Sequence, residues 1–184
     1  GELEQDYEFR RVEVVGPTVS GELAWTGTIG IGLSMLALLI YIWFRFEWQF
    51  GVGAVVSTIQ DFIMIVGLYV LLGLEFNLSS IAAILTVIGY SINDTVVIYD
   101  RIREMLRKYK KMPIEDVINI ALNQTLTRTI LTGLTVLLAL FALYLFGGEV
   151  ISSFVFAIIV GVFVGTYSSL FIAGPLLILF KLRP

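Results

Sequence analysis

The stretch FNLSSIAAILTVIGYSINDTVVIY, which runs from Phe76 to Tyr99, decides the fold of this chain. Its only charged residue is Asp94. At 1.5 Å per residue, a helix of this length spans the roughly 30 Å hydrocarbon core of a bilayer. A carboxylate in that core costs about 2.5–3.5 kcal/mol on insertion scales, so Asp94 is a candidate functional residue by default. The next question is which group compensates its charge.

The composition predicts a membrane protein. The chain is 58% hydrophobic with a mean hydropathy of +0.92, above the usage of soluble domains. Charged residues divide it into five long apolar runs, with predicted spans at 23–44, 50–74, 77–100, 127–146 and 150–173. Open strands leave their backbone groups unpaired in lipid, and the alternating pattern of a barrel is missing. We therefore predict an all-α membrane protein, a polytopic bundle of five transmembrane helices.

The residues outside the spans set the domain organisation. Residues 1–22 are polar and acidic and begin at Gly1 without a Met, which predicts the end of a truncated external domain in a longer protein. Residues 23–184 form the transmembrane domain. The chain has no Cys and no His, so disulfides, thiolate metal sites and an imidazole proton shuttle are excluded. We expect no catalytic residue, no metal, no cofactor and no nucleic-acid partner.

The basic residues predict the orientation. If the N-terminus lies outside, ten of the 12 Lys and Arg fall on the inner side, and only Arg10 and Arg11 remain outside. Trp25 then lies at the outer interface, with Trp43 and Trp48 at the inner one. We predict a multi-pass protein of the plasma membrane with an outer N-terminus and an inner C-terminus.

The inner segment 101–125 is amphipathic. Apolar residues recur at helical spacing on both sides of Pro113, in the sets Ile102, Met105, Leu106, Tyr109 and Ile114, Val117, Ile118, Ala121, Leu122. We expect the third span to run on as an amphipathic extension, and we predict two short helices that lie on the inner leaflet. Their basic face suits anionic lipid, and a partner protein or a ribosome-associated factor is the alternative.

Three charged residues fall at similar depth. Asp94 lies about 24 Å from the outer end of its helix, Arg128 about 28 Å and Asp61 about 21 Å, at 1.5 Å per residue. Asp94, Arg128 and Asp61 are therefore candidate proton-coupling residues in the inner half of the bilayer. Alternatively, Arg128 extends to the inner interface, since it begins its apolar run.

Polar residues at helical spacing accompany these charges. On the third span Thr86, Tyr90 and Asp94 are four residues apart, with Asn93 beside them. On the fourth span Gln124 or Thr125, Arg128, Thr132 and Thr135 form a matching stripe. We expect both stripes to face the bundle interior or a wet crevice, with Asn93, Tyr90 and Thr132 in support. Gly161, Gly165 and Ser168 form a small-residue face that favours close helix packing.

An acid and a guanidinium in the membrane can act as a switch. Beside Arg128, the carboxylate of Asp94 is held ionised; away from it, in a low dielectric, it takes up a proton. A helix shift that joins and separates the two groups would move protons across the membrane, driven by about 2.3 kcal/mol per charge per 100 mV. The alternative is a permanent ion pair that sets the helix register.

The residues around Asp94 also resemble a known family. The stretch GYSINDTVVIYDRIRE, from Gly89 to Glu104, closely resembles the signature of the SecF family, membrane subunits of the bacterial SecD–SecF protein-export complex. Further matching stretches lie at 15–23, 73–76, 123–129 and 145–148. The resemblance covers essentially all 184 residues.

The resemblance implies a function. SecF proteins belong to the proton-driven resistance-nodulation-division superfamily, pair with SecD and assist the SecYEG channel, using the proton-motive force to complete translocation of a preprotein. This chain would be the second to sixth helices of such a subunit, preceded by a strand near Tyr7 to Val15. In the family, the positions that match Asp94 and Arg128 are implicated in proton passage. Asp61 matches a further acidic position, where His-Asp is usual and this chain has Gln60-Asp61, so it ranks below the other two.

Three other classes of protein remain as alternatives. An intramembrane aspartyl protease needs two carboxylates, which Asp61 and Asp94 supply, but the Gly-x-Gly-Asp pattern is missing and Arg128 disfavours the shared proton. A proton-driven exporter of small molecules or lipids from the same superfamily is the main alternative. A purely structural subunit is the third.

Overall fold

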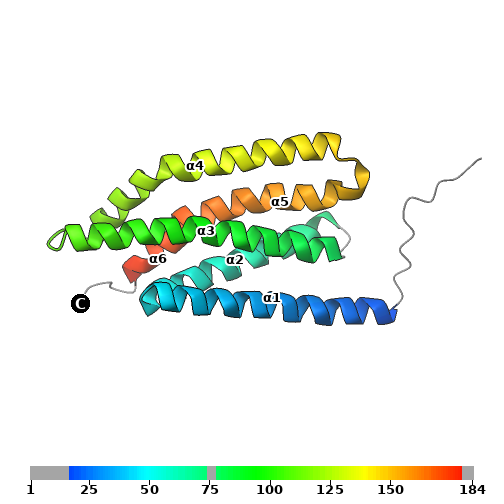
Figure 1. The fold of residues 1–184 in the computed structure, drawn as a ribbon, viewed down its shortest axis with the longest axis horizontal. Helices are drawn as coiled ribbons and strands as arrows, with labels where there is room; N and C mark the ends of the chain where they lie inside the picture. The colour runs from blue at the N-terminus through cyan, green and yellow to red at the C-terminus, as the bar shows by residue number, and fades with distance from the viewer. Residues whose placement is uncertain (1–16, 74–77, 180–184) are drawn as a thin grey trace, which may run out of the picture.

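A computed structural model describes residues 17–73 and 78–179 of the chain. The helical elements are α1 (Pro17–Arg45), α2 (Trp48–Leu72), α3 (Leu78–Lys108), α4 (Ile114–Phe146), α5 (Glu149–Ser168), the π-helix η1 (Ser169–Ala173) and α6 (Gly174–Leu179). They lie roughly side by side along one long axis (Figure 1). The strand implied near Tyr7 to Val15, and the basic residues Lys181 and Arg183, lie outside the described residues.

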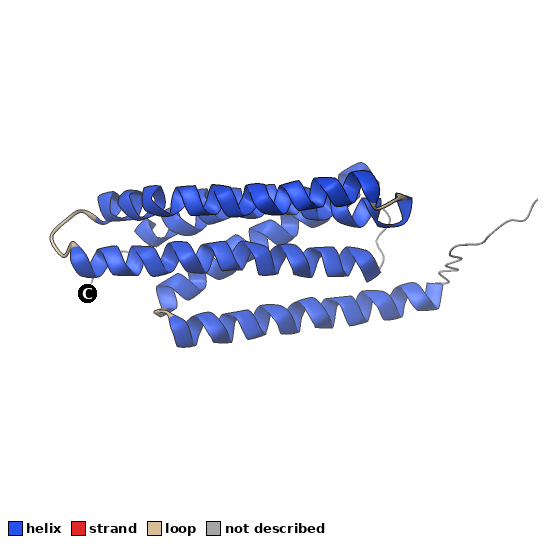
Figure 2. Cartoon of the chain, turned by 45° about the horizontal axis from the view of Figure 1, so that its top comes forward, coloured by secondary structure: helices blue, strands red, loops and turns tan. Residues whose placement is uncertain are grey.

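The five-span architecture is confirmed. Five helices within the described ranges are long and apolar enough to cross a membrane, and α5, η1 and α6 together form the last of them, Ile151–Leu179. All regular structure in these ranges is helical (Figure 2). Long apolar runs form helices in lipid because a helix pairs its backbone groups within one segment.

Helix α3 is the centre of the bundle. It packs against α5, α4, α2 and α1. Helix α1 lies at one edge, against α2 and α3, and α4 lies at the opposite edge, against α3 and α5 (Figure 1). The side chains on α3 therefore decide what the interior of the bundle contains.

Two glycines bring α5 close to α3. A Cβ atom on Gly161 would overlap the side chain of Val87, and one on Gly165 would lie 2.9 Å from the Cβ atom of Ser91. Both glycines are buried. The small-residue face predicted on the fifth span therefore lies at this helix contact, where the missing side chains let the two backbones approach.

The amphipathic segment is helical on both sides of Pro113, as predicted. Helix α3 runs on to Lys108, which confirms the expected extension of the third span, and α4 starts at Ile114 and continues into the fourth span. The apolar stripes are buried within the protein. They place Ile102, Met105 and Val117 in one core with Phe46 from the α1–α2 turn and Phe50 from the start of α2. Packing against this turn removes apolar surface from water, which makes a separate interfacial position unnecessary.

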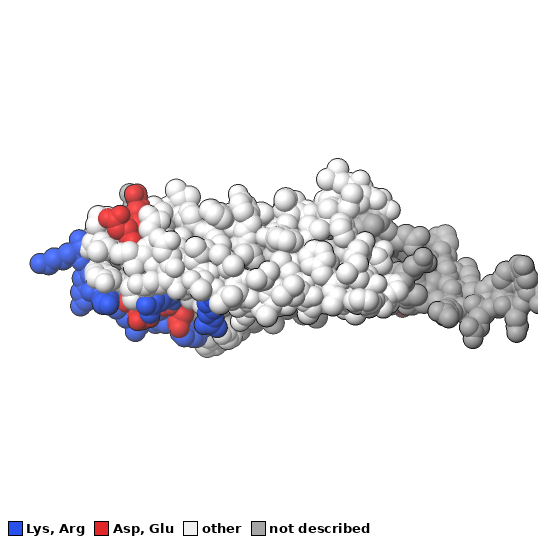
Figure 3. Space-filling model, turned by 90° about the horizontal axis from the view of Figure 1, so that it is seen from above, with Lys and Arg blue, Asp and Glu red and all other residues white. Residues whose placement is uncertain are grey.

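The tip of the α3–α4 hairpin extends beyond the rest of the bundle. Arg45 at the end of α1 pairs with Asp100 on α3 at 2.7 Å, and Lys108 lies eight residues further on, about 12 Å along the helix axis. Acidic and basic side chains gather at this end of the bundle, while the remaining described surface in the same view is uncharged (Figure 3). We call it the basic end, after Arg45 and the cations of the α3–α4 hairpin.

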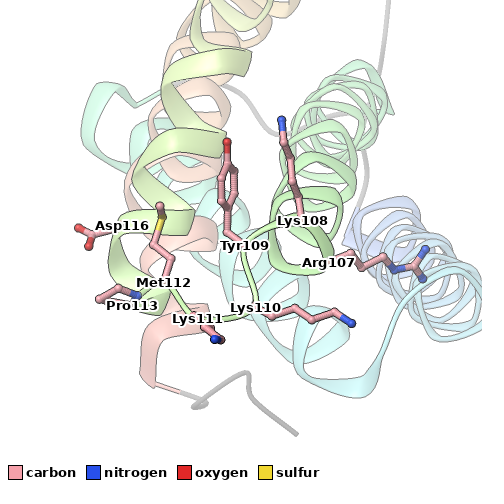
Figure 4. Close-up of a pocket in the computed structure, with 8 residues that line it drawn as sticks. All are labelled: Arg107, Lys108, Tyr109, Lys110, Lys111, Met112, Pro113 and Asp116. Carbon is pink, nitrogen blue, oxygen red and sulfur yellow. The ribbon is translucent and has the colours of Figure 1, made fainter.

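The hairpin tip does not form a convergent anion site. A shallow hollow of about 710 Å³ lies there, but Arg107, Lys108, Lys110 and Lys111 point in different directions around it (Figure 4). Lys108 lies over the ring of Tyr109, 5.3 Å from its centroid. The tip therefore presents a diffuse positive charge.

The last span widens at η1. Among the described residues, this is the π-helical segment, and it buries Ser169 and Ala173. The hydroxyl of Tyr99 on α3 donates a hydrogen bond to the Ala173 carbonyl at 3.1 Å. That hydroxyl occupies the space over Gly53 on α2, where a Cβ atom would overlap it. One side chain thus joins α3 to both α2 and the last span.

We predict that Gly161→Ala destabilises the chain by about 1–3 kcal/mol, because the added methyl group overpacks the contact with Val87. Gly89→Ala on α3 is the matched control, since nothing lies within 4 Å of its Cβ position. In a helix this control substitution adds about 0.5–1 kcal/mol of stability. Thermal unfolding in detergent measures both, and a Gly161→Ala chain as stable as the control would contradict the close approach.

Candidate functional site

Asp94 is buried in the bundle and is 5% exposed. Thr129 of α4 donates a hydrogen bond from its Oγ1 to Asp94 Oδ1 at 3.1 Å. The second carboxylate oxygen, Oδ2, is buried and has no hydrogen-bond partner in the described part of the chain. Asp94 therefore has one satisfied and one unsatisfied oxygen at the α3–α4 contact.

Arg128 lies beside this carboxylate without joining it. Its charge acts on Asp94 through space, but no nitrogen–oxygen distance between them is within 4.0 Å. Arg128 is exposed, whereas Thr129, the next residue, is fully buried against α3. The two predicted partners thus occupy neighbouring helices at the same level, and the contact itself is made by a hydroxyl.

Asp61 is the second buried carboxylate, with 0% exposure. Ser91 on α3 donates a hydrogen bond to Asp61 Oδ2 at 2.5 Å. The hydroxyl of Ser168 lies close by but donates to the Gly165 carbonyl at 3.1 Å, so Asp61 Oδ1 is left unsatisfied within the described ranges. Both intramembrane acids therefore share one pattern, a single hydroxyl donor and one free oxygen.

Hydrogen bonds from Ser169 connect α3 to the last span near both acids. Ser169 in η1 donates to the Ser91 carbonyl at 3.2 Å, and its hydroxyl lies 2.9 Å from that of Thr95. The π-helix η1 therefore contacts Ser91, which is the hydrogen-bond donor to Asp61, and Thr95, which is the residue after Asp94.

The predicted supporting residues occupy different positions. Tyr90 is half-buried, and its hydroxyl is packed against Gly133, where a Cβ atom would lie 3.2 Å away. Thr132 is half-buried, and Asn93 is exposed. Thr135 is exposed and donates to the carbonyl of Leu131 in its own helix. Of the two predicted polar stripes, Asp94 and Thr125 are buried in this bundle and Tyr90 and Thr132 are half-buried. The remaining members are exposed: Thr86, Asn93, Gln124, Arg128 and Thr135.

Four residues of the polar interior were missed from the sequence: Ser91, Thr95, Thr129 and Ser169. A signal for Thr129 was available, because Thr125, Thr129 and Gly133 are spaced by four and all are buried. That small-residue stripe marks the packed face of α4. Ser169 is marked in the same way, because Gly161, Gly165, Ser169 and Ala173 are small residues spaced by four.

These features define a polytopic membrane protein whose interior carries two carboxylates. The family model described as "Protein export membrane protein SecD/SecF, C-terminal" matches residues 1–183, and the chain belongs to this family. The resemblance seen in the sequence is thereby confirmed.

Named relatives support the assignment. The protein translocase subunit SecDF of Brucella abortus is 54% identical over 184 residues, which is 100% of this chain and 24% of that protein. The protein translocase subunit SecF of Rickettsia rickettsii is 53% identical over 177 residues, which is 96% of this chain and 58% of that protein. The chain therefore spans less than two thirds of the length of these relatives.

Solved structures agree with the fold. The SecDF crystal structure from Thermus thermophilus has a TM-score of 0.86 and 43% sequence identity, over 92% of this chain and 24% of that one. A crystal structure of SecDF in a super-membrane-facing form has a TM-score of 0.79 and 42% identity, over 91% of this chain and 22% of that one.

We predict that Thr129→Val destabilises the chain by about 1–3 kcal/mol, because it leaves the buried Asp94 carboxylate without its donor. Thr129→Ser keeps the hydroxyl and should retain most of the stability. Denaturant unfolding of Thr129→Val, Asp94→Asn and the double variant measures the coupling, expected at about 0.5–3 kcal/mol. Additive effects would contradict a direct interaction.

Proposed function

We propose that this chain is the membrane part of a proton-motive-force-coupled accessory subunit for Sec-dependent protein translocation across the bacterial inner membrane. The curated relatives are named protein translocase subunits, which supports a role in protein export. We assign it no catalytic reaction and no cofactor; the coupling ion is the proton. The substrate is a translocating preprotein, engaged by parts of the longer protein.

The observation that carries the proposal is the incomplete pairing of Asp94. One oxygen accepts from Thr129, the other has no partner, and Arg128 is near but not joined. Paired with Arg128 the carboxylate would be held ionised, and unpaired in a low dielectric it would take up a proton. A shift of α4 against α3 that brings Arg128 onto the free oxygen would therefore couple helix movement to proton release.

Asp61 has a secondary role in this proposal. It is fully buried and held by Ser91, and no cationic side chain of the described residues pairs with it. The residue before it is Gln60, where the family usually has a histidine, and a glutamine side chain cannot take up a proton in its place. We assign Asp61 as a further proton-coupling residue, whose protonation depends on the movement of α3 relative to α2.

The partner in the membrane is SecD. Asn93 on α3 and Arg128 on α4 are exposed, and Thr132, about one turn after Arg128, is half-buried. Polar side chains exposed to lipid are costly, so a second membrane subunit that covers them would lower the free energy. The SecYEG channel is the further partner of the complex.

The basic end lies on the cytoplasmic side in this proposal. The exposed cations of the α3–α4 hairpin are within reach of anionic lipid headgroups, which attract juxtamembrane basic residues by about 1 kcal/mol each. The diffuse arrangement of these side chains suits a charged surface better than a single bound ion. The N-terminus of the chain is then periplasmic.

A proton-driven exporter of small molecules or lipids is the alternative. The same acid and arginine would serve it equally well. The two functions differ in which transport depends on the proton gradient, that of a preprotein or that of a small hydrophobic substrate.

We predict that Asp94→Asn abolishes proton-dependent export in the intact complex, because the amide cannot take up and release a proton. Export of a preprotein into membrane vesicles, with and without a protonophore, measures the effect. The variant should still insert and bind SecD. Asp100→Asn is the matched control, one and a half turns further along α3, and it should retain coupling; pH-dependent export by Asp94→Asn would reject the motor.

The orientation is tested with single cysteines, since the chain has none. We predict that Ser153→Cys, exposed near the start of α5, reacts with a membrane-impermeant maleimide in intact cells. Lys110→Cys at the hairpin tip should react only after the membrane is opened. The reverse pattern would invert the topology.

A further inference from the structure

A narrow apolar groove lies between α1 and α2, at the edge of the bundle opposite α4. It has a volume of about 220 Å³ and is lined by Met35, Leu38 and Ile42 from α1, by Val55 and Ile59 from α2, and by Ile92 from α3. Thr58 also borders it, but its hydroxyl donates to the Ala54 carbonyl of its own helix at 2.8 Å. The groove therefore offers an almost wholly apolar lining.

The groove opens toward the surroundings of the bundle. Ile59 on its rim is 44% exposed, and α1 is held only along α2 and α3. In a membrane these surroundings are lipid. A dry apolar cavity of about 150 Å³ holds one benzene molecule, so this groove has room for a longer stretch of hydrocarbon.

Its length fits within one leaflet. From Met35 to Ile42 the α1 lining rises seven residues, about 10 Å, of the roughly 15 Å of hydrocarbon in one leaflet, and Arg45 lies about one turn beyond. Met35, Leu38, Ile42 and Arg45 follow one another at spacings of three and four, so the groove leads to Arg45 at the basic end. A lipid tail that enters there would lie parallel to its neighbours in the bilayer.

Cationic groups stand at the headgroup end of this groove. Arg103 Nη1 donates to the Arg45 carbonyl at 3.3 Å, which brings a second guanidinium to the end of α1. Arg103 Nε is buried and has no hydrogen-bond partner in the part of the chain that the structure describes, so this atom is not open to a headgroup. Arg45 pairs with Asp100, whereas the half-buried Arg103 has further Nη donors left for a phosphate oxygen.

We propose that the α1–α2 groove binds one acyl chain of a phospholipid from the leaflet at the basic end, with the headgroup phosphate at Arg103. The bilayer supplies this occupant, and the groove length and the cation at its end select it. A lipid held there fills the space between α1 and the rest of the bundle, where side chains leave the helices unpacked. This site does not depend on proton coupling.

The test uses a phosphatidylglycerol with a photoactivatable diazirine in the middle of one acyl chain, in vesicles that contain the protein. Cross-links mapped by mass spectrometry should concentrate on Met35, Leu38 and Val55. Val55→Phe fills the groove and should lower this cross-linking at least about tenfold, the factor for losing contact with about two methylene groups.

Val56→Phe is the matched control, because Val56 is the next residue, is 40% exposed and lines no part of the groove. It should leave the cross-linking unchanged. Arg103→Gln should lower the yield with phosphatidylglycerol, and Arg107→Gln at the hairpin tip should not.

Equal cross-linking of Val55 and Val56 in the unsubstituted protein would overturn the proposal, since it would describe ordinary surrounding lipid. This comparison needs no variant, so it stands even if Val55→Phe fails to fold. Protection of the groove in the complete complex, together with cross-linking from a partner helix, would also overturn it.

Discussion

A buried carboxylate in a membrane must find hydrogen bonds within the protein, and this requirement organises the bundle. Asp94 takes its donor from α4 and Asp61 takes its donor from α3. Each acid therefore ties two helices together at a defined level. Because each keeps one oxygen unsatisfied, neither arrangement is fully compensated, and the free energy of the site changes when a proton or a cation arrives.

The packing of α3 against the last span supports both acids. Gly161 and Gly165 let the two helices approach, and the approach brings Ser169 within hydrogen-bond distance of the Ser91 carbonyl. Ser91 is also the donor to Asp61. A movement of the last span would therefore act on the residue that holds one acid and on Thr95, beside the other. The contact between α3 and the last span and the site around the two acids are therefore linked by the same residues.

The sequence predicts which segments are helical better than it predicts which side of each helix is buried. Five spans follow directly from the length of the apolar runs, and Asp94 follows from its cost in lipid. The continuation of the third span was predicted, but its apolar stripe was placed on the inner leaflet, because an amphipathic sequence looks the same whether it packs on lipid or, as here, on Phe46 and Phe50. Arg128 was predicted as the cationic neighbour of Asp94, but its hydrogen-bond donor Thr129 was missed, because a charge stands out in a sequence whereas a threonine does not. Only the packing shows which of two adjacent residues faces inward.

The wide turn of the last span has a geometric consequence for the whole helix. Gly161, Gly165, Ser169, Ala173 and Leu177 are all buried, although residues four apart drift about 40° around a straight α-helix at each step. Over four steps the drift would reach about 160°, which would carry Leu177 to the far side. The additional residue in the π turn takes back about 100° of that rotation. Without the additional residue, Ala173 and Leu177 would rotate outward, and α6 would present a different side to its neighbours.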